Sequence, residues 1–472
     1  MNRDAAVPVG PAQLRPGAPG PDRPPAPRPT VEELRLTAFK SYRRAVLPLA
    51  PLTVLHGPAG VGKSNALDAL AVLARLALGE GIAGSLDGLP GRTGPLATAV
   101  RGGLAGCVPH GRDAVILGCT VCSPRGRIRL DLVIRTDGAV RIARESLSLD
   151  GRTLMDTGEQ DVRSGRVNVC WHNDTRQGDI RAPFPSGTMI TAQLPLRVAG
   201  SSSGERLVLA ATEDLLTALR EVFPLHPVPA LMRGWAKADP QARLRSNAAN
   251  ISAVIHRLAH ECPRRYGQLL RAVQTAAPHP LLGLALAERE GERGAGRRVL
   301  TVFDEGVLGR TGADQASDGM LRHLAFAAVL LTGAGVLDLD VAAEVPWAHR
   351  QLTVLAEDLG AGLGTEQTAS LLRLARDMAG RNQLRVVAAL QEPTAAREAF
   401  GAGEGGSGAG RSGAAVLVAC RRDPGTGLTV LRAEAARVPV QSGRGEEGSS
   451  AAGGGDGAPA AVGDAGAVDL GA

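Results

Sequence analysis

Aromatic residues are scarce in this 472-residue chain: they make up 2% of it, while hydrophobic residues as a whole make up 44%. The core must therefore be built mainly from leucine, valine and alanine. The length allows two or three domains, or one large domain with insertions. No apolar run reaches the ~18 residues that a membrane-spanning helix needs, and the N-terminus lacks the apolar region of a secretory signal. We therefore expect a cytoplasmic protein without a membrane partner.

Cysteine and lysine are also rare. The chain has 6 cysteines, and only Cys119 and Cys122 show a spacing found in metal sites. They fall in a strand-like run, where this spacing puts them on opposite faces, so we expect reduced thiols and no zinc site. Among 53 basic residues only Lys40, Lys63 and Lys237 are lysines. The net charge of +6 is spread along the chain, so it allows a nucleic-acid partner without requiring one.

The most informative stretch is Gly57-Pro-Ala-Gly-Val-Gly-Lys-Ser64, which lies between a strand-like run at 52–56 and a helix-like run at 66–78. This is the context of a G-x-x-x-x-G-K-[ST] phosphate-binding loop. Its glycines let backbone amides turn toward a phosphate at a helix N-terminus. Lys63 can reach the β- and γ-phosphates of ATP, and the Ser64 hydroxyl can bind Mg²⁺. The residues expected to contact the nucleotide are Gly57, Pro58, Ala59, Gly60, Val61, Gly62, Lys63, Ser64 and Asn65.

Two short motifs flank this loop: Phe39-Lys40-Ser41 before it, and Asp68-Ala69-Leu70 shortly after Lys63-Ser64-Asn65. Together they resemble the opening of ABC-class ATPase heads of the SMC/RecF/OLD-like group, which includes bacterial ATP-binding proteins with an AAA-type core. The resemblance implies an α/β fold: a P-loop NTPase head of the ABC type, with a mixed sheet, an antiparallel β-subdomain and a helical insertion. It also implies ATP and Mg²⁺ as cofactors. It covers about residues 31–395.

Composition divides the chain into segments. We expect a disordered Pro-rich arm at 1–29 and a disordered tail at 441–472, because neither has the apolar content or periodicity of a packed segment. Residues 401–440 are expected to hold a Gly-rich break and terminal strands. The ATPase domain is expected at 30–400, divided into the phosphate loop and β-subdomain at 30–205, the helical insertion at 206–300, and the signature and Walker B half at 301–400.

Hydrophobic periodicity predicts the main elements. Strands are expected at 114–122, 127–135, 139–142 and 146–149 as an antiparallel meander, and helices at 207–222, 249–261 and 263–275. His256 and His260 share one face of the second helix, but without a third ligand nearby they do not predict a metal site. No heptad repeat is sustained, so we expect no coiled-coil arm.

A second motif, Gln315-Ala-Ser-Asp-Gly-Met-Leu-Arg322, precedes an apolar helix. It resembles the ABC signature in its Leu-Ser-Asp-Gly-x-x-Arg form, with Ala316 in place of leucine. Ser317 and Gly319 stand at a helix start, where they can donate to a phosphate oxygen. In ABC dimers that phosphate belongs to the partner's nucleotide. The resemblance therefore implies a head-to-tail homodimer through the ATP sites.

A Walker B strand must supply one acid for Mg²⁺ and another to orient water. The run Leu352-Thr-Val-Leu-Ala-Glu357-Asp358 fits, and the resemblance implies that Glu357 takes the metal-side role and Asp358 the catalytic role. A rival, residues 336–340, also ends in acids, Asp338 and Asp340. We prefer the first reading because of the adjacent acid pair and the helix-like run after it. No Q-loop glutamine stands out.

The last core strand is expected at 384–390. Relatives carry a switch histidine after it, but this chain has Gln391. Glutamine can hydrogen-bond a γ-phosphate or a water but cannot titrate near neutral pH. The proline that follows the acid pair in relatives is Leu359 here. These departures leave nucleotide binding intact and weaken the case for fast hydrolysis.

Three functions remain open from the sequence. The first is a slow Mg²⁺-dependent ATPase that dimerises with ATP and has a DNA-linked role, in repair or phage defence, by analogy with its relatives. The second is an ATP-gated switch or scaffold with little hydrolysis, acting on a protein partner. The third, a transporter motor, is disfavoured because about 250 residues separate the phosphate loop from the signature, more than the resemblance implies for transporter heads. OLD-like proteins carry a C-terminal nuclease domain, but no nuclease module stands out after residue 400.

Overall fold

The computed structural model describes residues 28–88, 99–161, 163–175, 178–291, 296–338, 351–381, 384–401 and 415–434. The expected tail at 441–472 and nearly all of the expected arm at 1–29 lie outside these ranges. The fold described here belongs to the first of two contact-defined units, Met1–Ala436.

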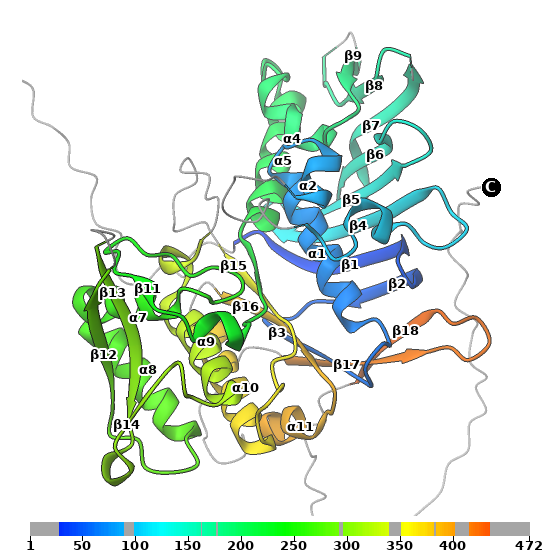
Figure 1. Cartoon of the computed structure of the whole chain (residues 1–472). Helices are drawn as coiled ribbons and strands as arrows, with labels where there is room; N and C mark the ends of the chain where they lie inside the picture. Colours follow the sequence, from blue (N-terminus) through cyan, green and yellow to red (C-terminus); the bar gives the residue numbers. More distant parts are fainter. Residues whose placement is uncertain are drawn as a thin grey trace, which may run out of the picture. The chain divides into compact units, whose positions relative to one another are not determined.

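One large mixed sheet holds most of the described strands (Figure 1). The pairs β10–β15, β15–β16, β16–β3, β3–β17 and β18–β2 are parallel, and the other pairs are antiparallel. In spatial order the strands are β10 (Val222–Leu225), β15 (Leu352–Ala356), β16 (Leu384–Leu390), β3 (Leu52–His56), β17 (Ala415–Arg422), β18 (Thr429–Glu434), β2 (Tyr42–Pro48), β1 (Thr30–Phe39), β4 (Ala114–Ser123), β5 (Gly126–Arg135), β6 (Arg141–Leu149), β7 (Arg152–Asp161), β8 (Arg166–Trp171) and β9 (Ile180–Pro185).

The parallel strands are buried on both faces. Every residue of β3, β15 and β16 is buried, as expected for parallel strands covered by helices on each side. Successive residues point to opposite faces, so Val54 and Leu55 belong to different apolar clusters. One cluster includes the helix that follows the phosphate loop, and the other includes the helix that follows the signature motif. The sequence prediction of an α/β fold with a mixed sheet is confirmed.

The antiparallel half corrects one sequence prediction. The two short strands expected at 139–142 and 146–149 form one strand, β6. The apolar alternation breaks because a carboxylate, Glu145, is fully buried in the middle of the strand. Its oxygens accept hydrogen bonds from the backbone amides of Ile190 and Thr191 at 2.8 and 2.6 Å. These bonds offset the cost of burying the carboxylate.

A second, smaller antiparallel sheet is built from segments before and after the helix pair at 251–276. Its members are β11 (Ala236–Lys237), β12 (Gly283–Glu290), β13 (Arg297–Asp304) and β14 (Arg310–Gly312). The central strand is β13, which pairs with the other three. Ser252 ties one face of β13 to a helix, since its hydroxyl accepts from the amide of Thr301 at 3.0 Å. Residues 206–300, expected as a helical insertion, thus also contribute strands.

The helices that hydrophobic periodicity predicts at 207–222, 249–261 and 263–275 are all present in the structure. The described helices are α1 (Lys63–Ala77), α2 (Ile82–Asp87), α3 (Gly103–Cys107), α4 (Ile190–Gln193), α5 (Ser203–Arg220), α6 (Pro229–Met232), α7 (Ile251–Glu261), α8 (Pro263–Ala276), α9 (Asp318–Thr332), α10 (Thr365–Arg381) and α11 (Thr394–Gly401), with short 3₁₀ turns η1 (Leu194–Leu196), η3 (Gly306–Leu308) and η4 (Ala334–Val336). In the part of the chain that the structure describes, none of the helices has the length and hydropathy needed to cross a membrane.

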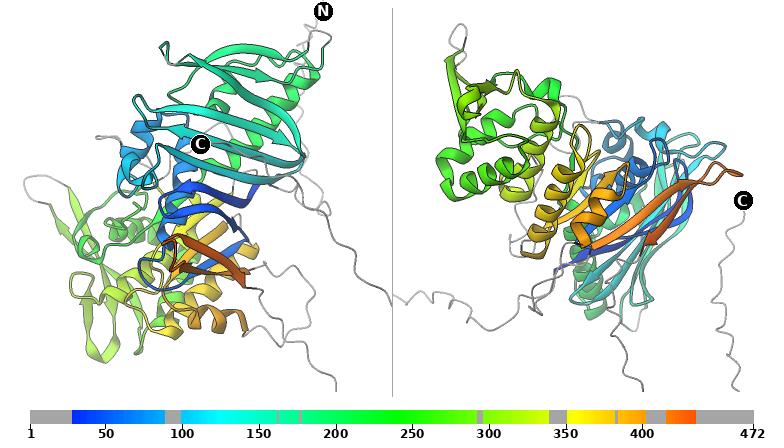
Figure 2. Two further views of the ribbon diagram at one scale, coloured as in Figure 1. Left: turned by 90° about the vertical axis from the view of Figure 1, so that its right-hand side faces the viewer. Right: turned by 90° about the horizontal axis from the view of Figure 1, so that it is seen from below.

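The terminal strands β17 and β18 are part of the large sheet. The sequence analysis set residues 401–440 apart from the ATPase domain, but β17 is the parallel neighbour of β3 and β18 reaches β2. Figures 1 and 2 show this hairpin, in orange, beside the blue N-terminal strands. The strand that leads into the phosphate loop therefore lies between β16 and β17, both supplied by the last part of the described chain.

A buried histidine on α9 predicts a pH-dependent stability. The His323 side chain is almost fully buried, and its Nε2 donates to the carbonyl of Ala272 at 3.2 Å. Burial lowers the pKa of His323 to about 4, from an ordinary value of 6.5. Between pH 4 and pH 6.5, His323 is therefore protonated in the unfolded chain and uncharged in the folded chain. The stabilising contribution of uncharged His323 is therefore fully present above pH 6.5 and is lost as the pH falls toward 4.

We expect the free energy of unfolding to fall by up to about 3 kcal/mol over this interval because of His323 alone. Urea unfolding of the wild type and of His323→Gln from pH 7.5 to pH 4.5 measures it. The variant should lose less stability on acidification than the wild type. Equal losses in both proteins would contradict the prediction.

Candidate nucleotide site

The phosphate loop leaves the carboxyl end of β3 and opens directly into α1. Gly57, Gly60 and Gly62 have φ angles of 145°, 80° and 107°, a region that L side chains rarely adopt. A methyl group at Gly57 would also lie 2.3 Å from the carbonyl oxygen of Cys420. Gly62 is the N-cap of α1, and no side chain caps this helix end. The helix start therefore has no side-chain cap, the arrangement in which helix N-termini bind anions.

The lysine of the loop is buried and held by carbonyl groups. The Lys63 side chain donates from Nζ to the carbonyls of Gly57 and Pro58 at 2.6 and 2.8 Å. Burial lowers the pKa of Lys63, and the nearby Cys420 and Asp358 act in the opposite direction. Within the described residues Lys63 forms no ion pair, so its positive charge can serve a phosphate.

The β17–β18 hairpin holds the loop from outside. Thr429 donates from Oγ1 to the carbonyl of Val61 at 2.8 Å, and its amide donates to the carbonyl of Ser41 at 2.9 Å. Arg422 donates from Nε to the carbonyl of Gly60 at 3.1 Å. The shape of the phosphate loop therefore depends on residues more than 350 positions away. Sequence reasoning predicted this strand pair but not its contact with the loop.

The acid pair stands where the sequence analysis places it, directly after β15. The amide of Glu357 donates to the carbonyl of Leu225 at 3.2 Å, which anchors the end of the strand to its neighbour β10. Asp358 has a φ of 49°, a left-handed conformation in which aspartate is one of the more tolerant residues. Such backbone angles cluster at functional sites.

Two residues that the sequence analysis did not single out contact the first acid. Arg101 forms ion pairs with Glu357 at 2.8 Å and with Asp68 at 3.2 Å, and Lys40 also pairs with Asp68 at 2.7 Å. Burial lowers the pKa of Arg101, but Asp68 and Glu357 together raise it above its ordinary value. His226 lies on the other side of Glu357, with Nδ1 3.5 Å from Oε2. Glu357 is thus held between Arg101 and His226.

His226 could have been found from the sequence. It directly follows the short apolar run of β10, and polar residues at the carboxyl ends of parallel strands gather at one edge of a sheet. The same rule identified the acid pair. Arg101 had only a weak signal, an arginine before Gly102 and Gly103 in a loop. No periodicity marks it.

Gln391 lies against the start of the phosphate loop. The backbone carbonyl of Gln391 accepts a hydrogen bond from the backbone amide of Gly57 at 3.2 Å. Gln391 and Asp358 line the same cavity, of about 380 Å³, together with residues from the N-termini of α10 and α11. Cavities of this size hold small ligands or groups of water molecules. The structure thus brings Lys63, Asp358 and Gln391 to one end of the sheet.

The signature motif begins α9. Ser317 is the N-cap of this helix, and its hydroxyl accepts a hydrogen bond from the first turn. Arg233 forms an ion pair with Asp318 at 2.6 Å. A methyl group at Gly319 would lie 2.1 Å from the carbonyl oxygen of Gly362. Among the described residues, these contacts of the motif run to Arg233 and to the loop after the acid pair, and not to the phosphate loop of the same chain.

The described part of the rival acid segment, residues 336–338, does not form a strand of the large sheet. The 3₁₀ turn η4 ends at Val336, and Leu337 makes an isolated bridge with Leu244. Asp338 follows this bridge, and Asp340 lies outside the described residues. The buried strand beside β16 is β15, so the geometry favours Glu357 and Asp358 over the rival.

The other candidate ligands lie at two separate places in the fold. His256 and His260 stack with ring centroids 4.4 Å apart, and Cys119 and Cys122 are both free thiols. Over the described ranges, no three or more His, Cys, Asp and Glu side chains are grouped so that they could hold a metal ion.

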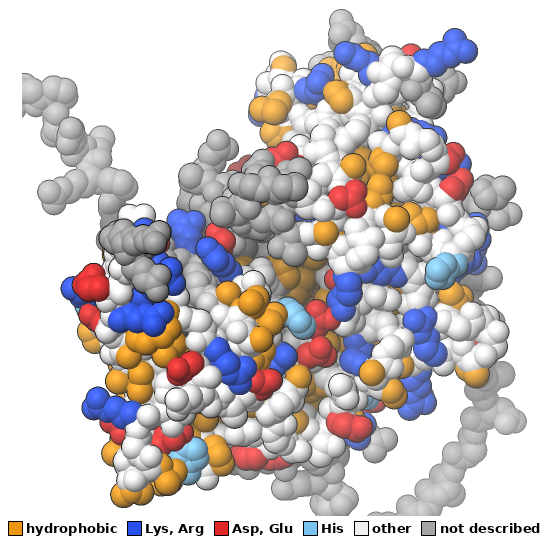
Figure 3. All heavy atoms as spheres, viewed as in Figure 1, with side chains coloured by type: hydrophobic (Ala, Val, Ile, Leu, Met, Phe, Trp, Pro, Cys, Tyr) orange, Lys and Arg blue, Asp and Glu red, His pale blue; other side chains and the backbone are white. Residues whose placement is uncertain are grey.

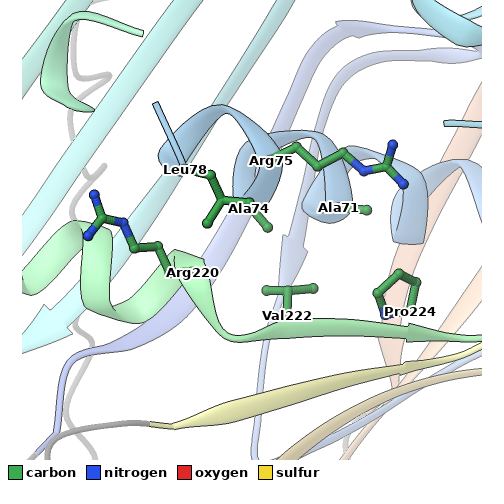
Figure 4. A pocket seen from close by; sticks show the side chains of 7 residues that line it. All are labelled: Ala71, Ala74, Arg75, Leu78, Arg220, Val222 and Pro224. Atoms are coloured by element: carbon green, nitrogen blue, oxygen red, sulfur yellow. The ribbon is translucent and has the colours of Figure 1, made fainter. Parts of the chain in front are cut away.

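A small cavity beneath α1 is not a ligand site. It measures about 10 Å³, which is room for little more than one water molecule. Figure 4 shows Arg75 and Arg220 at its two ends with their guanidinium groups pointing away from each other. Arg220 donates from Nε to the carbonyl of Ala77 at 3.0 Å. The cavity is a packing gap between α1 and β10.

Comparison with solved structures finds SMC head domains. A structure of the Smc head bound to the C-winged helix domain of ScpA is 12% identical, with a TM-score of 0.45, covering 86% of this chain and 97% of that one. The SMC head domain from Thermotoga maritima is 11% identical, with a TM-score of 0.36, covering 85% and 98%. An Smc head with an extended coiled coil, bound to the C-terminal domain of ScpA derived from Pyrococcus furiosus, is 12% identical, with a TM-score of 0.41, covering 86% and 96%.

No family model matches the chain, and no curated protein matches it. At the identities and scores of the solved structures, the similarity assigns no role to any residue of this chain.

Proposed function

We propose that this protein binds ATP with Mg²⁺ and hydrolyses it slowly. One observation carries the proposal: a glycine loop with left-handed backbone angles leads into an uncapped helix N-terminus, with the buried Lys63 amine directed into it. Amides, helix dipole and lysine together suit a triphosphate. The chain's own residues therefore form a cradle that fits the nucleotide.

The site residues have separate roles in nucleotide binding and hydrolysis. Lys63 and the loop amides bind the β- and γ-phosphates, and Ser64 and Glu357 would hold Mg²⁺. When bound, the metal neutralises charge that develops on the phosphates. Asp358 orients or deprotonates the attacking water, and Gln391 hydrogen-bonds the same water or the γ-phosphate. Arg101, now paired with Glu357 and Asp68, is placed to add positive charge at this end of the sheet.

The signature supports a homodimer through the ATP sites. Ser317 and Gly319 lie at the start of α9, a 15-residue helix, and can donate to a phosphate of a second copy's nucleotide. Gly319 touches Gly362 in the loop after the acid pair. A phosphate bound at the signature would thus lie beside the loop that follows the two proposed catalytic acids. A DNA-linked role, in repair or phage defence, is the form of this function suggested by the sequence resemblance.

A second function, an ATP-gated switch acting on a protein partner, is favoured by one observation. Glu357, the proposed metal-side acid, is engaged on both sides by Arg101 and His226. Gln391 replaces the titratable histidine of relatives. Together these features favour nucleotide binding over rapid turnover.

The test is ATP binding and hydrolysis by the purified chain, with and without single-stranded and duplex DNA. We expect binding of a fluorescent ATP analogue and slow release of phosphate, both lost in Lys63→Ala. Arg112→Ala, which removes an exposed charge away from the site, is the matched control. Binding without turnover under every condition would support the switch. Unchanged binding in Lys63→Ala would overturn the proposal.

A further inference from the structure

Three basic residues meet in one row across the small sheet. Arg298 in the central strand β13 lies directly opposite Lys237 of β11 on one side and Arg289 of β12 on the other. Directly opposed residues in antiparallel strands share a face, with Cβ atoms about 5 Å apart. Like charges in this arrangement destabilise a sheet. We call Lys237, Arg298 and Arg289 the cation row.

The acids of the same strands do not pair with the cation row. Asp304 of β13 lies on the row's face, but it is paired with Arg310 at 3.7 Å. Glu288 and Glu290 flank Arg289 in β12, and strand alternation turns both toward the opposite face. There Glu288 pairs with Arg297 at 3.1 Å and with His256 of α7 at 3.7 Å. Throughout the described ranges, no ion pair involves a member of the cation row. The row is thus a concentration of positive charge without an internal counter-charge.

Uncharged contacts hold two of the three cations in place. The Arg289 guanidinium lies over the ring of Trp235, 4.3 Å from its centroid. Arg298 donates from Nη1 to the carbonyl of the same Trp235 at 3.2 Å. These contacts orient both guanidinium groups and leave their charge uncompensated. Ordering them in advance lowers the entropic cost of binding an anion.

Two members of the cation row are accessible. Lys237 and Arg289 are exposed and Arg298 is half-buried. On the same face, by strand alternation, Ala285, Ala287 and Val302 are half-buried and Leu300 is buried. Figure 3 shows Lys and Arg side chains gathered above a strip of hydrophobic side chains over this sheet. A row of cations with two exposed members suits an extended polyanion better than a single small ion. Guanidinium groups match phosphate oxygens in geometry.

We propose that the cation row binds the phosphodiester backbone of a nucleic acid. The site shares no residue with the nucleotide site, and the inference goes beyond ATP binding and does not depend on it. It also explains why the sequence shows no basic stripe: strand pairing assembles the row from three separate segments. Phosphate contacts of this kind give affinity that depends strongly on salt and little on base sequence.

The first experiment measures fluorescence anisotropy of a labelled single-stranded 20-mer, without nucleotide, over a series of salt concentrations. The variant is Lys237→Gln/Arg289→Gln, and the matched control is Arg297→Gln, a neighbour of Arg298 on the opposite face and paired with Glu288. We expect the double variant to bind about tenfold more weakly and to lower the salt slope by about 1.4, at about 0.7 per contact. Arg297→Gln should bind as the wild type does. Equal effects in both variants, or none in the double variant, would overturn the proposal.

Running the same titration in Lys63→Ala separates this site from the nucleotide site. Unchanged oligonucleotide binding in that variant is expected, whether or not the ATP proposal holds. Poly-glutamate of matched charge serves as competitor. If it displaces the oligonucleotide as well as unlabelled DNA does, the surface is a general acidic docking site and the nucleic-acid assignment fails.

Lysine footprinting gives an independent readout. Lys63 is buried and Lys40 is paired with Asp68, so Lys237 is the exposed lysine of the chain. Brief acetylation followed by mass spectrometry should therefore modify Lys237 first. Bound oligonucleotide is expected to protect it severalfold. Undiminished acetylation of Lys237 at saturating oligonucleotide would refute contact at the cation row.

Discussion

A chain that ends at residue 413 is expected to aggregate and to show no detectable ATP binding. Removal of β17 takes away the parallel neighbour of β3 and leaves a hydrophobic strand edge exposed. It also removes Val418 and Cys420 from the core. The loop would lose its bonds from Thr429 and Arg422. Soluble yield, circular dichroism and binding of a fluorescent ATP analogue measure the effect.

Two further variants make this prediction decisive. A chain that ends at residue 436 keeps β18 and is expected to fold and to bind ATP as the full chain does. Thr429→Val removes the hydroxyl that bonds both the Val61 carbonyl and the Ser41 hydroxyl, so the fold should persist while ATP binds about fivefold more weakly or worse, since each hydrogen bond contributes about 1 kcal/mol. Wild-type ATP binding by the chain that ends at residue 413 would refute the proposed role of the hairpin.

Asp358→Asn is expected to lower ATP turnover about a hundredfold or more and to leave ATP affinity within about threefold. The amide keeps the size of the side chain but cannot accept a proton. Asp358 lines the cavity with Gln391 and lies close enough to act on the pKa of Lys63. Single-turnover phosphate release and equilibrium binding, measured on the same preparations, separate the two effects.

Three variants control this result. Asp377→Asn, on the exposed side of α10, should leave turnover unchanged. Glu357→Gln should weaken the dependence on Mg²⁺ and release Arg101 from one of its two ion pairs. Asp338→Asn tests the rival acid segment. If it abolishes turnover and Asp358→Asn does not, the acid assignment is wrong.

Local sequence patterns predicted much of the fold because the elements concerned carry their own signals. The phosphate loop has its glycines, and β16 is a run of seven buried residues. The start of α9 has a serine cap at Ser317. Each of these depends on neighbours within a few positions, which is the range over which periodicity and capping act.

The missing parts of the site are non-local. The contact of Thr429 with Val61 arises because β17 and β18 insert beside β3, and no pattern in either segment encodes that pairing. The engagement of Glu357 by Arg101 and His226 likewise depends on the order of strands in the sheet. The burial of Glu145, which misled the strand assignment, is stabilised by amides some 45 residues later.

The position of β3 has a consequence for synthesis on the ribosome. Both hydrogen-bonded neighbours of this strand, β16 and β17, lie far downstream of it in the sequence. The first of them begins about 330 residues after β3 ends, a delay on the order of 15–65 s at 5–20 residues per second. Throughout that time the nascent chain carries an apolar strand with two open edges. The phosphate loop that follows β3 therefore cannot take its final shape until both neighbouring strands have been made.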